Sequence, residues 1–191
     1  MDTTTDTPAE QPYEGAVEPD TKDWTWVLRE TCPECGFTAA DVDPRSVPDL
    51  IPAQIAFWRR VLVHPRVAER PAPDVWSPLE YACHVRDVYD IFGTRVELIR
   101  DEDDPIFRNW DQDQAAVEGR YREQRPLVVA DELTECAAAL AAIVQTLPDD
   151  AWDRKGERSN GSSFTTTTLL QYFLHDVVHH VHDVRQHLGE V

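Results

Sequence analysis

Apolar side chains recur every three or four positions along four long segments of the chain. This spacing is typical of amphipathic helices, because it gathers the apolar side chains on one face. The segments run from Ser46 to Val63, from Ser77 to the acidic run Asp101–Asp104, from Pro126 to Leu147 and from Thr165 to Leu188. A short helix is expected from Asp113 to Tyr121, and a loop or small hairpin from Trp152 to Ser163. With almost no other strand signal, the pattern predicts an all-α four-helix bundle with a longer crossing between the second and third helices.

Local signals support the helix ends. Ser77 precedes Pro78, and Glu80 follows three residues after Ser77, which is the pattern of a capping box with proline at the first helical position. Pro148 stops the third helix. The chain then divides into a disordered acidic tail at 1–23, an N-terminal extension at 24–45 and a helical bundle at 46–191.

The amino-acid composition limits the classes of partner that the chain is expected to bind. The 191 residues are enough for one domain, and 36 acidic against 18 basic residues give a net charge of −18. Such a charge argues against nucleic acid or an anionic membrane as a partner, since both need a basic face. No stretch approaches the ~20 apolar residues of a membrane span, and the N-terminus lacks the basic start and apolar core of a secretion signal. A cytoplasmic location is expected.

The strongest chemical signal lies in the last predicted helix. Five of the seven histidines fall between Tyr172 and Leu188, together with two aspartates. Imidazole and carboxylate are common ligands of divalent metals, and residues four apart share one helix face. Two such pairs compete, Asp176 with His180 and His175 with His179.

The phase of the helix favours one of these pairs. The apolar stripe of the last helix is centred between Val177 and Val181. His180 lies on the flank of this stripe with Asp176 on the same side, whereas His179 points almost directly away from it. Asp176 and His180 are therefore the better candidates to face the bundle interior, with His175 and His179 as the alternative. Polar, solvated histidines on a helix flank would also fit the pattern.

A third ligand has to come from another helix, and His84 on the second helix is the obvious donor. Bundles build metal sites from ligands on facing helices. Three protein ligands leave positions open for water or substrate, which is the plan of a catalytic site. Taken alone, His84 would fit equally well as a half-buried histidine bonded to a neighbour.

The four cysteines fall into two kinds. Cys32 and Cys35 form a C-P-E-C motif, which is typical of half a zinc site, of a redox pair or of a tight turn before Gly36. A second C-x-x-C is missing, so a zinc ribbon is incomplete. Cys83 and Cys136 sit in apolar helical contexts and are expected to be small core residues.

Two segments resemble the DinB-like proteins. W-S-P-L-E-Y-A-C-H, from Trp76 to His84, is similar to their second-helix signature, and H-D-V-V-H-H-V-H-D-V, from His175 to Val184, is similar to their last-helix signature. The resemblance covers roughly Ser46 to Val191 and implies an up-down-down-up four-helix bundle of DinB-like type. The C-P-E-C extension lies outside the family's core.

The resemblance also implies a set of metal ligands. It makes His84 the first ligand, places Asp176 and His180 at the two ligand positions of the last helix, and places Asp183 at the polar position after them. DinB-like proteins usually carry histidine where this chain has Asp176. The branch that includes mycothiol-dependent maleylpyruvate isomerase carries a carboxylate there.

The implied function is that of a metal-dependent enzyme. Zinc or nickel would activate a low-molecular-weight thiol of the mycothiol or bacillithiol type, or water, for transfer to an electrophile. The activity would be that of a thiol S-transferase or an isomerase-like enzyme. Asp183 and Asp87 are expected to orient ligands. No catalytic residue beyond the ligands is assigned, and family analogy suggests a homodimer.

Two other functions stay open. The first is a non-catalytic metal-binding or ligand-binding bundle, which Trp58, Trp76 and Trp110 exposed at the mouth of the site would support. The second is a redox module centred on Cys32 and Cys35. A catalytic site leaves coordination positions open, whereas a structural site is saturated by protein ligands.

Overall fold

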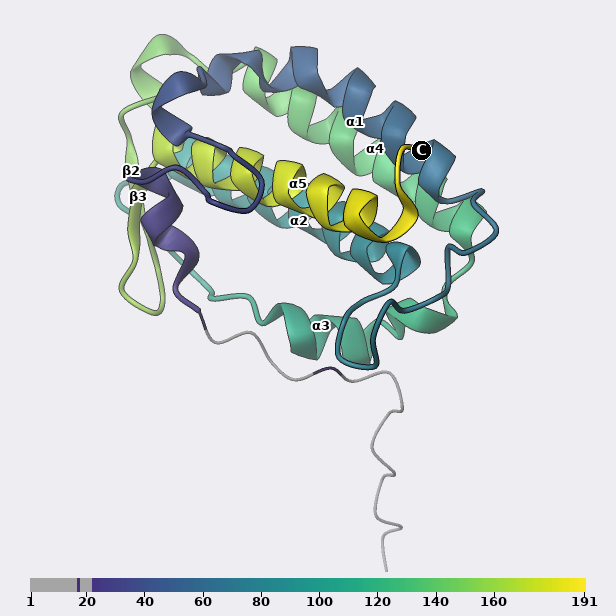
Figure 1. Ribbon diagram of the computed structural model, residues 1–191. Helices are drawn as coiled ribbons and strands as arrows, with labels where there is room; N and C mark the ends of the chain where they lie inside the picture. The colour runs from purple at the N-terminus through teal and green to yellow at the C-terminus, as the bar shows by residue number, and fades with distance from the viewer. Residues whose placement is uncertain (1–16, 18–21) are drawn as a thin grey trace, which may run out of the picture.

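The computed structural model describes Val17 and residues 22–191 (Figure 1). The expected disordered tail therefore lies outside the described residues, apart from Val17, Lys22 and Asp23. The α-helices are α1 Val47–Val61, α2 Pro78–Asp101, α3 Gln112–Glu118, α4 Pro126–Gln145 and α5 Thr166–Leu188. The short 3-10 helices are η1 Trp24–Leu28, η2 Ala39–Asp41, η3 Pro44–Ser46, η4 Tyr121–Glu123 and η5 Asp149–Ala151. The strands are β1 Ile106–Phe107, β2 Lys155–Arg158 and β3 Ser163–Thr165.

The four long helices pack into one bundle, as the periodicity predicts. The α2 helix packs against α4 and α5, and α1 packs against α4. In Figure 1, α5 lies in front of α2, while α3 stands apart on the crossing between α2 and α4. Trp58, Tyr89, Leu133 and Phe173 are fully buried between the helices. The buried Trp58 does not stand at the mouth of a site, so it gives no support to the ligand-binding alternative.

The start of α2 is firmly anchored. Ser77 and Glu80 form the predicted capping box, in which the Ser77 amide and hydroxyl donate to Glu80 Oε2 at 2.8 and 2.7 Å. Arg70, from the preceding loop, donates its Nε to the same carboxylate at 2.9 Å. This network fixes the first turn of the helix that carries His84 one turn further on.

A small three-stranded sheet closes one end of the bundle. The β2 and β3 strands form an antiparallel hairpin. A small hairpin was one of the two structures predicted for the Trp152–Ser163 segment, the other being a loop. The pairing of β1 with β2 in parallel was not expected, because two residues are too short to show an alternating pattern. Gly156 is required at this junction, since a Cβ there would lie 2.7 Å from Ile99 Cγ1.

The N-terminal extension packs along α5 (Figure 1). Gln171 on α5 donates its side-chain amide to the carbonyl oxygens of Ala39 and Val42, at 2.8 and 3.2 Å. Val27 and Phe37 of the extension are buried. The extension is therefore an ordered part of the domain, and it covers a face of α5 that the helix phase alone would leave to solvent.

Among the described residues, no helix is both long enough and apolar enough to cross a membrane. Cys83 is buried in the core, as expected. Cys136 is half-buried and packs against the core cluster.

Candidate metal centres

The α5 helix carries most of the candidate ligands and has a well-defined start. Thr165 caps the helix by accepting a hydrogen bond from the Thr168 amide, and the Thr168 hydroxyl accepts one from the Thr165 amide in return. The Thr167 hydroxyl donates to the Trp152 carbonyl at 3.0 Å. These bonds set the rotation of α5 about its axis, and so decide which neighbours its histidines meet.

The first cluster joins α2 to α5. One ligand atom from each of His84, Asp176 and His180 lies within 4.8 Å of the others. Asp176 Oδ1 is 3.4 Å from His84 Nε2 and 3.6 Å from His180 Nε2. Atoms bound at ~2.1 Å to a tetrahedral ion lie ~3.4 Å from one another. The three side chains that the sequence singled out thus meet at separations that suit one metal ion.

The polar atoms of this cluster are short of partners within the protein. His84 is fully buried, with the Trp110 ring stacked on it at 5.3 Å and the Trp76 ring tilted against it at 5.3 Å. Neither His84 nitrogen, nor Asp176 Oδ1, has a hydrogen-bond partner among the described residues. Leaving a buried polar group unsatisfied costs about 1–3 kcal/mol. A bound cation would satisfy Asp176 Oδ1 and one His84 nitrogen together, so these residues fit a metal.

The protonation states of His84 and Asp176 suit metal binding, whereas for His180 burial is outweighed by Asp183 and Asp176, which raise its pKa, so metal binding there must release a proton. Burial lowers the pKa of His84, so its imidazole is neutral near pH 7. Burial works against the charged form of Asp176, but the neighbouring His84 and His180 outweigh it and lower the pKa of this carboxyl to about 2. A neutral imidazole and an ionised carboxylate are the forms that bind divalent cations.

Asp183 contacts His180. Its Oδ2 lies 2.9 Å from His180 Nδ1, one turn along the same helix. A proton held on Nδ1 by this carboxylate leaves Nε2 as the lone-pair atom, and Nε2 is the nitrogen that faces Asp176. Asp183 thus lies beside His180 as an orienting carboxylate would, and its orienting role stays a prediction.

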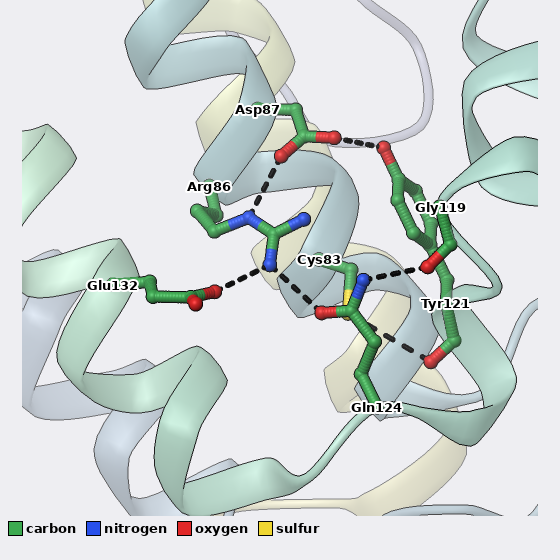
Figure 2. Close-up of polar contacts among 7 residues, drawn as sticks. All are labelled: Cys83, Arg86, Asp87, Gly119, Tyr121, Gln124 and Glu132. Carbon is green, nitrogen blue, oxygen red and sulfur yellow. Dashed lines mark hydrogen bonds and ion pairs between the residues drawn. The ribbon is translucent and has the colours of Figure 1, made fainter.

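Asp87 has different partners from those that the sequence suggested. Figure 2 shows its carboxylate between Arg86, whose Nε donates to Oδ1 at 2.7 Å, and the hydroxyl of Tyr121, which donates to Oδ2. Arg86 continues the network to Gln124 and Glu132, at 2.8 and 2.6 Å. Asp87 thus ties α2 to the α3–α4 connection and to α4, and it makes no hydrogen bond to His84.

A second cluster lies beside the first, and the sequence did not suggest its composition. One ligand atom from each of Cys32, Cys35, His175 and His179 lies within 4.8 Å of the others. Cys32 Sγ is 3.7 Å from His179 Nδ1. All four side chains are buried or half-buried, and both cysteines are free thiols. The C-P-E-C motif and the alternative histidine pair are therefore two halves of one constellation.

The position of His179 corrects the helix-phase argument. The phase of the helix predicted that His179 points away from the bundle and is exposed to solvent. The side chain is instead buried, because the extension covers this face of α5 and packs Trp24 against the imidazole at 5.2 Å. The missed signal was a C-x-x-C motif together with an H-x-x-x-H pair, which between them provide two sulfur and two nitrogen ligands.

A cavity of about 300 Å³ opens over both clusters. Asp176, His179 and His180 lie in its wall, together with Trp24 and Glu34 of the extension. Trp76 and Tyr81, at the start of α2, line it as well. The first cluster is thus accessible to a small molecule through Asp176 and His180, while His84 stays buried behind them. Trp76 is itself buried and Trp110 half-buried, so neither is an exposed side chain at the mouth.

Comparison with known proteins agrees with this architecture. The sequence model of the DinB superfamily matches residues 65–186. No curated protein matches the chain significantly. A solved structure, described as "YfiT from Bacillus subtilis is a probable metal-dependent hydrolase with an unusual four-helix bundle topology", is similar with a TM-score of 0.65 and 17% sequence identity. The similarity covers 85% of this chain and 93% of that one, so the two share a fold.

Proposed function

This chain belongs to the DinB superfamily, and on that basis we propose that it is a metal-dependent enzyme whose divalent ion is held by His84, Asp176 and His180. The observation that carries the proposal is the convergence of these three ligand atoms at the wall of a cavity. Three protein ligands leave coordination positions for water or substrate, as catalytic zinc sites do. The description of YfiT as a probable metal-dependent hydrolase is consistent with this proposal.

The chain's own residues prepare the site for chemistry. When bound, zinc or nickel would lower the pKa of a coordinated water or thiol and so supply a nucleophile near neutral pH. Asp183 holds the proton on His180 Nδ1 and keeps Nε2 turned inward. Trp76 and Trp110 shield His84 from solvent. Burial raises the pKa of Tyr81, so its phenol stays protonated and can donate a hydrogen bond to a molecule in the cavity.

The cavity indicates the class of substrate. Its volume of about 300 Å³ suits a small molecule rather than a polymer. Among the described residues, Glu34, Asp74 and Asp113 add carboxylates to its wall, which also holds one lysine, Lys22. We therefore propose a neutral or cationic electrophile, attacked by water or by a low-molecular-weight thiol of the mycothiol or bacillithiol type. In the thiol reaction the sulfur loses its proton to a wall carboxylate and forms a new bond to the electrophilic carbon. The bond from that carbon to its leaving group breaks, and the group departs with the electron pair, as halide does from an aryl halide.

The test combines metal content with turnover. Protein purified without a histidine tag is analysed for metal, beside His180→Ala and a control, His187→Ala. His187 lies on the same helix but contacts Arg66, with its Nδ1 3.4 Å from Arg66 Nη2, away from both clusters. The proposal expects His180→Ala to lose one equivalent of metal, and His187→Ala to retain it.

Turnover is then measured on the zinc- and nickel-loaded forms. Hydrolysis of an activated aryl ester reports on water as the nucleophile, and conjugation of mycothiol or bacillithiol to an aryl halide reports on a thiol. Activity that needs metal and disappears in His180→Ala supports the proposal, and the reactive nucleophile distinguishes a hydrolase from a thiol transferase. Metal bound by the triad without turnover in either assay would favour a non-catalytic metal-binding bundle.

A further inference from the structure

We propose that Cys32, Cys35, His175 and His179 form a second metal site, a closed structural zinc site that fastens the N-terminal extension to α5. Their four ligand atoms lie within 4.8 Å of one another. In a tetrahedral site with zinc–sulfur bonds of ~2.3 Å and zinc–nitrogen bonds of ~2.05 Å, sulfur and nitrogen lie ~3.6 Å apart. The separation of Cys32 Sγ from His179 Nδ1 is 3.7 Å.

The backbone of the cysteine turn is shaped to present both sulfurs to one point. The Gly36 amide donates to the Cys32 carbonyl at 2.9 Å, and the Cys32 amide donates to the Phe37 carbonyl at 2.8 Å. Gly36 closes the turn with a φ of +74°, a conformation that glycine adopts without strain. These bonds fold the turn so that both cysteines lie on one side of it, close to His175 and His179. A plain surface turn would not require either cysteine.

The histidine half is equally well ordered. His175 and His179 are four residues apart on α5 and both are buried. Trp24 contacts both rings, at 5.7 and 5.2 Å, and Phe37 contacts His175 at 5.7 Å. His175 Nε2 is buried and has no hydrogen-bond partner among the described residues. A polar atom enclosed by aromatic rings in this way is costly unless something binds it.

His179 also has the carboxylates that metal-bound histidines need. Its Nδ1 faces Cys32, while its Nε2 lies 3.6 Å from Glu34 Oε2 and 3.7 Å from Asp183 Oδ1. A ligating imidazole usually directs its other N–H to a carboxylate, which fixes the ring and its tautomer. Glu34 belongs to the C-P-E-C motif itself, so the motif supplies two sulfur ligands and an orienting group.

The donor set indicates a structural role. Two thiolates and two neutral imidazoles saturate a tetrahedral zinc ion and neutralise its charge, which leaves no position for a substrate. A redox pair would need a reactive, accessible thiol, but Cys32 is only 1% exposed. Trp24 and Glu34 line the cavity over the first cluster. The second site therefore holds one wall of that cavity in place.

Cobalt(II) substitution of the full chain tests the proposal. Thiolate ligands give cobalt a sulfur-to-metal charge-transfer band in the near ultraviolet, whereas a site of two histidines and one aspartate cannot. We expect the untagged wild-type protein to bind two equivalents of zinc and its cobalt form to show this band. The Cys32→Ser/Cys35→Ser protein should bind one equivalent and lack the band, and Cys136→Ser, the control, should keep both.

The outcomes separate this site from the first. His180→Ala should lose one equivalent of metal but keep the sulfur band, so failure of the first site leaves this proposal intact. A wild-type cobalt protein without the band would overturn the proposal, and this measurement needs no variant to fold. A Cys32–Cys35 disulfide in protein isolated without oxygen would also overturn it, in favour of a redox pair.

Discussion

His179 and His180 are neighbours in sequence, yet their imidazoles lie in different clusters. His179 Nδ1 is 3.7 Å from Cys32 Sγ, whereas the His180 ring lies 4.7 Å from the ring of His84. Successive residues of a helix point about 100° apart, so one histidine meets the extension and the other meets α2. Asp183 stands between them, 2.9 Å from His180 Nδ1 and 3.7 Å from His179 Nε2. One carboxylate thus contacts a histidine from each cluster.

Replacing Asp183 by asparagine should weaken metal binding at the first cluster. An amide can present its NH₂ group to His180 Nδ1 and no longer favours the proton there. Loss of such an orienting carboxylate costs about 10–100-fold in metal affinity. A zinc competition titration measures the change. The exposed Asp150→Asn should leave the affinity unchanged, and an Asp183→Asn protein with wild-type affinity would contradict an orienting role.

Asp87→Asn should lower stability without a comparable loss of metal affinity. The carboxylate binds Arg86 and Tyr121 rather than His84, and hydrogen bonds to a charged group contribute about 1.5–3 kcal/mol. Urea unfolding of the metal-free protein measures the first effect, and zinc titration the second. Asp90→Asn, three residues further along α2 and exposed, is the control. A ten-fold or greater loss of zinc affinity in Asp87→Asn would restore Asp87 as an orienting group of the metal site.

Glu80 should make the protein sensitive to acid. Burial opposes the ionisation of this carboxyl, but hydrogen bonds from Arg70 and Ser77 outweigh it and lower the pKa of Glu80. Its stabilising effect is therefore complete above the unfolded pKa of about 4.3 and is lost as the pH falls through the lower folded pKa. Glu80→Gln should cost about 3–5 kcal/mol at pH 7, as breaking a buried ion pair does.

The cost of Glu80→Gln should shrink as the pH falls below about 4.3, because the unfolded wild-type protein then takes up a proton on this carboxyl before the folded protein does. Urea unfolding of metal-free protein at pH 7 and pH 3 checks this. Glu97→Gln removes the exposed pair with Arg100 and should change stability by about 1 kcal/mol or less. An equal deficit for Glu80→Gln at both pH values would count against the ionised Glu80–Arg70 pair as the source of the effect.

Zinc should raise the melting temperature of the protein by two separable contributions, one from each metal site. Free zinc at 100 times Kd stabilises the folded state by about 2.7 kcal/mol per site. For a domain of this size each part corresponds to about 5–11 °C. His84→Ala should lose one part and Cys35→Ser the other, as measured by calorimetry with and without a chelator. A wild-type melting temperature that does not respond to zinc would contradict both sites.

The sequence predicted the bundle well because its helices carry strong, independent signals. Periodic apolar positions, the Ser77–Glu80 capping box and Pro148 set the bounds of α2 and α4 to within two residues. The parallel pairing of β1 with β2 could not be predicted, since it depends on a contact between Ile106 and Glu157 that no local pattern encodes.

The candidate triad could be predicted because its residues lie on regular helices. The second cluster was missed because its cysteines lie in an irregular segment. His84, Asp176 and His180 each lie on a long amphipathic helix, so helix phase and the DinB resemblance both indicate which way they face. Cys32 sits in an irregular segment whose position over α5 is set only by tertiary packing. Helix phase treated the outer face of α5 as solvent, and no local signal placed the extension there.

The second cluster joins residues that are far apart in the order of synthesis. Cys32 and His179 are separated by 147 positions. At about 5–20 residues per second, a ribosome needs about 7–30 s to make the intervening chain. Throughout that interval the cysteine turn has been made but its histidine partners have not. The extension can therefore dock only after α5 is complete, so the first segment of the domain to be synthesised is among the last to reach its final place.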